Sequence, residues 1–337
     1  MTKCASPLIA DLSGKRSPST KSMLSAIRNR RSLIIAMVLG LALLLFAFFS
    51  FPFIDFELYS TYDANIPNAS VFFDKYDLDS LHGDIGTVTI NDLVIVSAFS
   101  RNHASEMRAL EGVPYRLVIY RMIDVDEDET NLMRRHCPKQ VEFRIFDFDE
   151  YPAYVRNLKE YRWKHLIIAQ LLMEGPLVFW VDSSVRFYDD PRQSIQTVID
   201  YAKRPESLNV VQLCDTGHKI FPVTIKEMFV RFCYPEEQAK KLNMFAGGVT
   251  LWIRSPRTVK ILKEMVSCSL EKECMAPKGA RLRCDSAVIS MGNKFAGCHR
   301  FDQSALAVVL SKEANFDLSR YAYTGGELTF LKVERGT

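Results

Sequence analysis

Short apolar runs separated by longer mixed segments dominate the chain after residue 90. The first three runs are rich in β-branched and aromatic residues: LVIVSAF at 93–99, YRLVIYRM at 115–122 and VEFRIFDF at 141–148. Turn-forming and helix-length segments lie between them, and this alternation is typical of βαβ units. The pattern therefore predicts a single α/β domain over residues 91–337, with a Rossmann-like, mainly parallel central sheet.

The clearest helical pattern runs from Ala153 to Glu174. Apolar residues recur there at spacings of three and four, and Gly175-Pro176 supplies a stop signal. The next run, PLVFWVD at 176–182, is apolar on both faces, which predicts a strand in the middle of the sheet. Later elements are expected as strands at 208–214 and 244–254 and as a helix from Pro256 to about Leu270.

A different pattern occupies the amino-terminal part of the chain. Residues 33–54 carry no charge, and a helix of that length crosses a bilayer core of about 30 Å. Seven basic residues and one acid precede this segment, for a net charge of +6, and acidic residues follow it. The positive-inside rule then predicts a cytoplasmic tail at 1–32, a signal anchor at 33–54 and a lumenal stem at 55–90.

A cleaved signal peptide is the alternative interpretation of this segment. Its hydrophobic region would be shorter, about 7–15 residues, and would end at a small-residue cleavage site. The run here ends in FFSFPFIDF, which favours the uncleaved anchor. We therefore expect a single-pass type II protein of the Golgi or ER membrane, with the α/β domain in the lumen.

Charge and cysteine content agree with a lumenal domain. The whole chain carries +3, so the part beyond the basic tail carries −3, and nothing in it indicates nucleic-acid binding. Seven of the eight cysteines follow the predicted anchor, where an oxidising compartment permits disulfides. Zinc is the alternative for the last four, but their spacing is not that of structural zinc sites, so disulfides are favoured. Asn68-Ala69-Ser70 is a sequon for N-glycosylation.

The candidate chemistry lies at the end of the predicted central strand. In LVFWVDSSVRF, the carboxylate of Asp182 follows five apolar residues directly. The carboxyl ends of strands in open α/β sheets are where ligands bind. The chain lacks a phosphate-loop lysine motif, a GxGxxG after the first strand, a GxSxG elbow and an HExxH helix, which argues against nicotinamide enzymes, common hydrolases and zincins.

Four segments in order, YRWKHLIIAQLL, VFWVDSSVRF, FAGGVTLW and CHRFDQSALAVVL, carry a resemblance. With the predicted anchor, they resemble a family of nematode type II membrane proteins, which is itself similar to nucleotide-sugar glycosyltransferases of the A fold. The resemblance covers roughly residues 90–312. It implies a glycosyltransferase-A-like fold and transfer of a sugar from a nucleotide-sugar donor.

The resemblance also implies a site, with one departure. A-fold transferases carry an Asp-x-Asp motif that holds a divalent metal on the donor diphosphate, and here Asp182 matches the first acid while Ser184 replaces the second. Mn²⁺ and Mg²⁺ prefer several oxygen ligands. Three alternatives follow: His299 completes the metal site, the cations of Arg186 and Lys164 replace the metal, or catalysis is lost.

Other positions carry structural alternatives beside their implied roles. Gly247 and Gly248 match the stretch that lines the donor-sugar and acceptor pocket, although a bulge or turn also explains them. Asp302 matches an acceptor-activating base or a donor-sugar contact, and the next residue, Gln303, is expected to bind the donor. Asp302 followed by an apolar run is also an ordinary helix N-cap. Arg162 reaches either a donor phosphate or, at the helix rim, the solvent.

A buried structural histidine is likewise the alternative to a metal ligand at His299. The sequence thus leads to a membrane glycosyltransferase that acts on a glycan or glycoprotein acceptor, with Asp182 and Asp302 as catalytic residues. The missing second acid motivates a second hypothesis, a non-catalytic lumenal domain that binds carbohydrate or nucleotide. A membrane-tethered structural protein is the third.

Overall fold

The computed structural model describes residues 67–81, 83–103, 115–136, 141–188, 192–325 and 330–334. The predicted tail and the predicted anchor at 33–54 lie outside these residues. Within the described ranges, no helix has the length and apolar character needed to cross a membrane.

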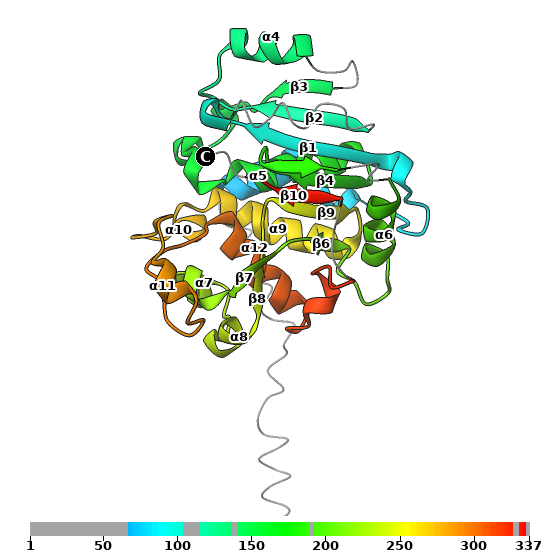
Figure 1. Cartoon of the computed structure of the whole chain (residues 1–337). Helices are drawn as coiled ribbons and strands as arrows, with labels where there is room; N and C mark the ends of the chain where they lie inside the picture. The colour runs from blue at the N-terminus through cyan, green and yellow to red at the C-terminus, as the bar shows by residue number, and fades with distance from the viewer. Residues whose placement is uncertain are drawn as a thin grey trace, which may run out of the picture. The chain divides into compact units, whose positions relative to one another are not determined.

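A six-stranded sheet forms the centre of the domain (Figure 1), with the strand order β3-β2-β1-β4-β9-β6. The strands β3, β2, β1 and β4 are parallel, whereas β9 is antiparallel to both of its neighbours. The prediction of a mainly parallel α/β sheet is therefore confirmed. The strand bounds are β1 Leu93–Phe99, β2 Arg116–Arg121, β3 Val141–Ile145, β4 Leu177–Val181, β6 Val210–Gln212 and β9 Val249–Ile253.

Two small antiparallel pairs complete the strands. β10 (Leu331–Val333) pairs with β5 (Val185–Phe187), and β7 (Asp215–Lys219) pairs with β8 (Asn243–Phe245). The strand predicted at 244–254 is therefore two strands, β8 and β9, which separate at the glycine pair.

Helices cover both faces of the sheet. The α-helices are α2 Pro67–Lys75, α4 Glu127–His136, α5 Trp163–Glu174, α6 Arg192–Ala202, α7 Lys226–Arg231, α8 Glu236–Lys241, α9 Pro256–Leu270, α10 Lys272–Met275, α11 Ser286–Ile289 and α12 Asp302–Glu313. Short 3-10 turns are η2 Leu78–Ser80, η3 Ile90–Asp92, η4 Arg101–His103, η6 Phe148–Glu150, η7 Ala153–Arg156, η8 Leu158–Glu160, η9 Phe221–Val223 and η10 Leu318–Arg320.

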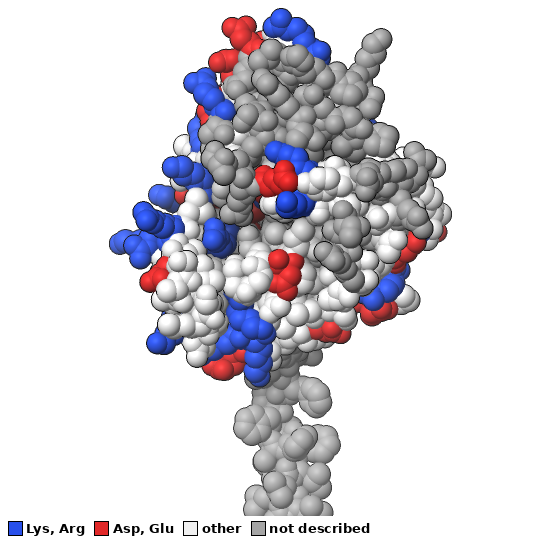
Figure 2. Space-filling model, in the orientation of Figure 1, with Lys and Arg blue, Asp and Glu red and all other residues white. Residues whose placement is uncertain are grey.

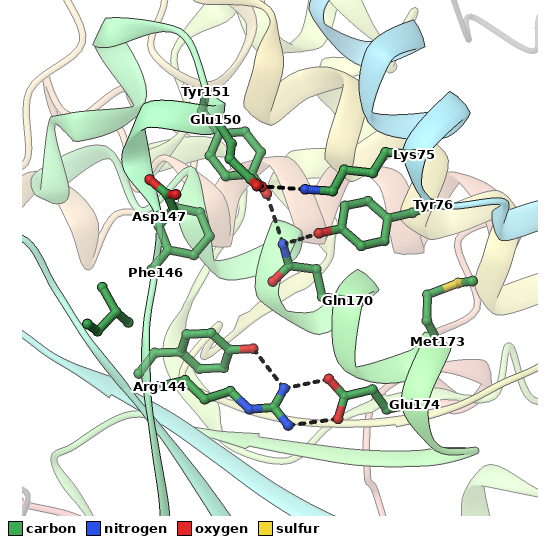
Figure 3. Close-up of a pocket in the computed structure, with 12 residues that line it drawn as sticks. Lys75, Tyr76, Arg144, Phe146, Asp147, Glu150, Tyr151, Gln170, Met173 and Glu174 are labelled. Carbon is green, nitrogen blue, oxygen red and sulfur yellow. Dashed lines mark hydrogen bonds and ion pairs between the residues drawn. The ribbon is translucent and has the colours of Figure 1, made fainter.

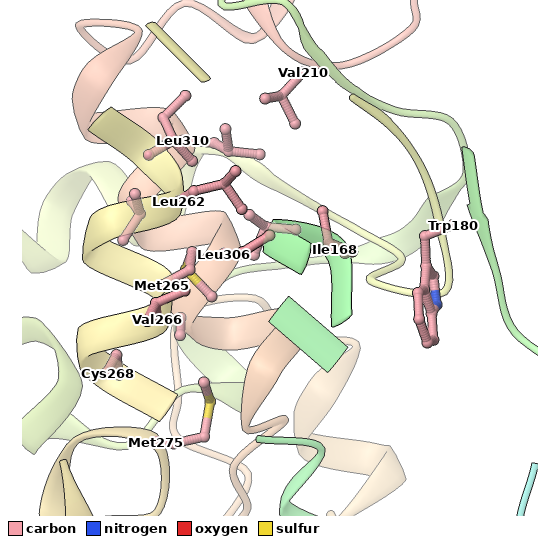
Figure 4. Packing of buried hydrophobic residues seen from close by; sticks show 14 of the residues in the cluster. Ile168, Trp180, Val210, Leu262, Met265, Val266, Cys268, Met275, Leu306 and Leu310 are labelled. Atoms are coloured by element: carbon pink, nitrogen blue, oxygen red, sulfur yellow. The ribbon is translucent and has the colours of Figure 1, made fainter. Parts of the chain in front are cut away.

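The alternation of side chains along β4 divides the core in two. Val178 and Trp180 pack with α5, α9 and α12 on one face (Figure 4), whereas Leu177, Phe179 and Val181 pack with α6 on the other. All five residues of β4 are buried, as expected of a central strand. Helix α5 lies between the sheet and α9, so nine of its twelve residues are buried and it is apolar on most of its surface.

One predicted boundary is wrong. The helix expected from Ala153 to Glu174 begins only at Trp163, because Tyr161 adopts a left-handed conformation with φ 53° that an α-helix cannot continue through. Within the predicted stem at 55–90, the part that the structure describes packs with the domain. Its residues Phe72 and Leu78 are 3% and 1% exposed and belong to the main core.

The cysteine prediction is confirmed for four residues. Disulfides join Cys268 to Cys274 and Cys284 to Cys298, so the first connects the end of α9 to α10 and the second closes a loop that contains α11. Among the described cysteines, Cys214 and Cys233 are free.

Removing the second disulfide should destabilise the domain. A crosslink that closes a loop of this length, with a sequence separation of 14, contributes about 3 kcal/mol by restricting the unfolded chain. The double substitution Cys284→Ala/Cys298→Ala should lower the free energy of unfolding by that amount in denaturant titrations. Cys233→Ala, at an exposed free cysteine, is the matched control, and equal stabilities for the two variants would contradict the pairing.

Candidate functional site

Asp182 lies where the sheet reverses its order of connection. From β1 the chain adds β2 and β3 on one side and then returns to add β4 on the other, so the carboxyl ends of β1 and β4 flank a topological switch point. Asp182 directly follows β4, and 42% of its side chain is exposed. The carboxylate is therefore available to a ligand at the edge where open α/β sheets bind them.

Neighbouring groups fix the direction of this carboxylate. The indole Nε1 of Trp180 donates to Asp182 Oδ1 at 2.7 Å, and the backbone N of Asp182 donates to the carbonyl of Gly248 at 2.8 Å. A Cβ atom on Gly248 would overlap Asp182 Oδ2 and lie 2.7 Å from its Cγ. Only glycine therefore leaves room for the carboxylate in this position.

Lys164 joins Asp182 to a second acid. Its Nζ lies 3.2 Å from Asp182 Oδ1 and 2.9 Å from Asp302 Oδ2, and it donates to the carbonyl of Gly247 at 3.3 Å. An ammonium group has three donors, so these three oxygens match its full capacity. The Lys164 side chain is only 4% exposed, which makes this a buried cation between two carboxylates.

The protonation of the cluster follows from burial and charge. Burial alone would lower the pKa of Lys164, but Asp182 and Asp302 outweigh it and hold that pKa above its ordinary value. Burial raises the pKa of Asp302, and the charge of Asp182 adds to the effect, while Lys164 offsets it in part. With both acids ionised, Lys164, Asp182 and Asp302 together carry a net charge of −1. Asp182 is the member of this cluster that is exposed to solvent.

Asp302 is the first residue of α12 and is 4% exposed. The N-cap position belongs to Phe301, which makes no side-chain cap hydrogen bond, so Asp302 is not the N-cap residue that the sequence offered as an alternative. A Cβ atom on Gly247 would lie 3.2 Å from Asp302 Oδ2 and 3.3 Å from the Cα of Gln303. The glycine pair thus brings its backbone against both acids, in the break between β8 and β9.

Arg162 has a structural role and not the predicted contact with phosphate or solvent. Its side chain is 1% exposed, and its guanidinium donates to Glu160 and to the carbonyls of Ser269, Glu271 and Lys272. These carbonyls lie where α9 ends and α10 begins, so the arginine caps a helix carboxyl terminus from a neighbouring element.

The polar residues after Asp182 hold the turn together. Arg186 donates to the carbonyls of Ser183 and Val185, and the carbonyl of Ser184 accepts from the backbone of Glu334 at 2.7 Å. Arg186 therefore donates to the backbone of its own turn, although it is close to Asp182 in sequence.

On the face shown in Figure 2, charged residues of both signs lie among one another.

His299 is fully buried and its backbone is held by the carbonyl of Arg281. Its Nδ1 accepts from the backbone of Ile225 at 3.4 Å, and burial lowers its pKa to about 3, which the Met275 carbonyl offsets only in part. No group of three or more His, Cys, Asp and Glu residues suited to a metal occurs among the described residues. A metal-binding role for His299 stays a prediction, and its surroundings are those of a structural histidine.

Trp180 also belongs to the site, although the sequence predicts it only as part of a buried strand. Residues i and i+2 of a strand point to the same side, so a tryptophan two positions before Asp182 could have indicated this contact. Tyr161 also belongs to the site, since Lys164 Nζ lies 5.4 Å from the ring centres of both Tyr161 and Trp180.

Residues 84–169 match the family described as protein of unknown function DUF1647. No curated protein matches the chain. Among solved structures, mouse xyloside xylosyltransferase 1 in its apo form is similar at 11% identity and a TM-score of 0.35, over 68% of this chain and 83% of that one. The mannosyltransferase Ktr4p from S. cerevisiae in complex with GDP is similar at 11% identity and a TM-score of 0.36, over 72% and 76%.

Replacing Arg162 should test its structural role. In Arg162→Met, Glu160 and three carbonyls lose a buried partner, so we expect the free energy of unfolding to fall by about 3 kcal/mol in denaturant titrations. Arg101→Met, at a side chain 64% exposed, should stay within about 0.5 kcal/mol of the unmodified protein. A small effect at Arg162 would mean that its guanidinium is not needed to hold α9 and α10.

Proposed function

We propose that this protein is a glycosyltransferase that binds a nucleotide-sugar donor at Asp182 and transfers the sugar to a hydroxyl of a glycan or glycoprotein. The observation that supports this best is the buried ammonium of Lys164 between Asp182 and Asp302 at the switch point of the sheet. Lys164 thus holds two acids together. Asp182 is exposed and would bind the donor, whereas Asp302 is buried and its raised pKa suits proton transfer.

The donor diphosphate requires positive charge, since the cluster itself is negative. Mg²⁺ is commonly bound by one or two carboxylates together with substrate phosphates, and Mn²⁺ also suits oxygen ligands. Asp182 Oδ2 fits this role, because Oδ1 is engaged by Trp180 and Lys164 while the side chain remains open to solvent. A bound divalent cation would stabilise the charge that develops on the leaving diphosphate.

The residues of the chain supply the rest of the chemistry. Lys164 positions both acids and, as a fixed cation, lowers the cost of bringing phosphate oxygens close to Asp182. Asp302 accepts the proton of the acceptor hydroxyl, and its raised pKa makes it a better base than an exposed aspartate. Because Gly247 and Gly248 carry no side chain, both acids can lie directly against this backbone, in the positions where the donor and the acceptor would meet them.

The proposed setting is the Golgi or ER membrane, with a type II anchor at 33–54 and the site in the lumen. The uncharged segment and the basic residues before it support this orientation. The two disulfides suit an oxidising compartment.

A non-catalytic binding domain is the second candidate. Ser184 stands where the resemblance implies a second acid, and its carbonyl is used to hold β10. Such a domain would bind the donor without transferring the sugar.

The Asp182→Asn substitution separates these functions. In the full-length protein, we expect UDP- or GDP-sugar binding by calorimetry to depend on Mn²⁺, and Asp182→Asn to reduce sugar transfer by at least a hundredfold, because the exposed charge is lost. Asp200→Asn, at an exposed acid on α6, is the control and should keep full activity. Donor binding without transfer in the unmodified protein would favour the binding domain, and no binding of any nucleotide sugar would overturn both.

A methyl group at Gly248 should disturb the same acid. Gly248→Ala forces Asp182 away from Trp180 and Lys164, so we expect donor affinity and transfer to fall at least tenfold. Gly175→Ala is the matched control, because a Cβ at Gly175 meets nothing within 4 Å. Binding measured by calorimetry should distinguish the two variants, and unchanged binding in Gly248→Ala would show that the position of Asp182 is not critical.

A further inference from the structure

A hollow lies on another part of the domain, between α2, the end of β3, η6 and the carboxyl-terminal half of α5 (Figure 3). Its volume of about 510 Å³ is within the range of small-molecule sites. The residues that define its chemistry are Tyr76, Tyr120, Arg144, Phe146, Tyr151 and Gln170.

Helix geometry separates this hollow from the Asp182 site. Gln170 follows Lys164 by six residues, so it lies about 9 Å further along the axis of α5 and about 240° around it. Lys164 points at Asp182 and Asp302, whereas Gln170 points at Tyr76 and Tyr151. A ligand held by Gln170 would therefore be bound independently of the donor.

Gln170 organises the polar groups of the hollow. Its Nε2 donates to the hydroxyl of Tyr76 at 3.0 Å and to that of Tyr151 at 2.9 Å. Both phenol oxygens act as acceptors in these bonds, so each keeps its own O–H to donate. Among the hydrogen bonds of the described residues, none uses the amide oxygen of Gln170. Two hydroxyl donors and one carbonyl acceptor are thus grouped on one wall.

Aromatic packing fixes the rings that carry these groups. Tyr151 stacks on Phe146 with ring centres 5.1 Å apart and an angle of 3° between the planes. Tyr76 packs against Phe72 at 4.7 Å. The hydroxyls are therefore held in place before any ligand binds, which reduces the entropy lost on binding.

The charges around the hollow are paired with one another. Arg144 makes two bonds to Glu174, at 2.5 and 2.8 Å, and also donates to the hydroxyl of Tyr120. At the rim, Lys75 pairs with Glu150 at 2.7 Å. The remaining acid, Asp147, accepts from the backbone of Asp149 and points away from Gln170 in Figure 3. A neutral ligand rather than an ionic one fits this wall.

We propose that this hollow is a carbohydrate-binding site for a neutral sugar residue. A sugar hydroxyl both donates and accepts, so adjacent hydroxyls match the mixed set of Gln170, Tyr76 and Tyr151. The apolar face of a sugar ring matches the half-buried rings of Tyr76 and Tyr151. The site binds a glycan whether or not the protein transfers a sugar, so it does not depend on catalysis at Asp182.

The test uses the full-length protein and the methyl glycosides of glucose, galactose, mannose and xylose, with methyl glucuronide as the charged comparison. Saturation-transfer NMR and titration should show binding of at least one neutral glycoside, and weaker binding of the glucuronide. Tyr76→Phe/Tyr151→Phe keeps both rings and removes both hydroxyls, so it should weaken binding at least tenfold. Tyr188→Phe, whose hydroxyl bonds to Glu334 outside the hollow, should leave binding unchanged.

Two further variants complete the test. Gln170→Ala should weaken glycoside binding to a similar extent, and it covers the case in which the double variant folds poorly. Asp182→Asn should leave this binding intact. The proposal is overturned if no neutral glycoside binds at about 50 mM, a concentration that detects even very weak sites. It is also overturned if the folded tyrosine variant binds normally, or if Asp182→Asn abolishes the binding.

Discussion

The buried ammonium of Lys164 is the interaction on which the arrangement of the site depends. Two carboxylates this close, one of them 4% exposed, would repel each other and favour protonation without a cation between them. Lys164 is held in turn by its place in the first turn of α5, a helix buried on most sides. The position of both acids therefore follows from the packing of one helix against the centre of the sheet.

Close approach of the backbone is the second constraint. Gly247 and Gly248 lie at the break between β8 and β9, where one carbonyl accepts from Lys164 and the next from the backbone of Asp182. Side chains at these positions would meet Asp302 and Asp182 respectively. The same two residues thus connect a strand of a small sheet to a strand of the central sheet and line the acids.

Three polar side chains at or near helix α5 have different roles, although the helix is mostly apolar and buried. Arg162 precedes it and caps the end of α9, Lys164 joins the two acids, and Gln170 organises the hydroxyls of a separate hollow. Each of the three side chains bonds to partners on other elements, because burial of a polar group without a partner would be costly. The spacing of the three residues along the helix directs them to different neighbours.

The sequence by itself determined the class of fold, the order of the central strands along the chain, the disulfide-bonded cysteines and the place of Asp182 at the end of a buried central strand. These features depend on local patterns, since alternating apolar and polar residues, turn residues and apolar runs can be recognised in short stretches of sequence. Tertiary structure alone decided that Arg162 is structural, that Tyr161 interrupts the predicted helix and that Lys164 faces Asp302. The roles of Arg162 and Lys164 depend on contacts between segments more than a hundred residues apart, which no local pattern encodes. The left-handed conformation of Tyr161 is a local feature, but neither a glycine nor a proline in the sequence signals it.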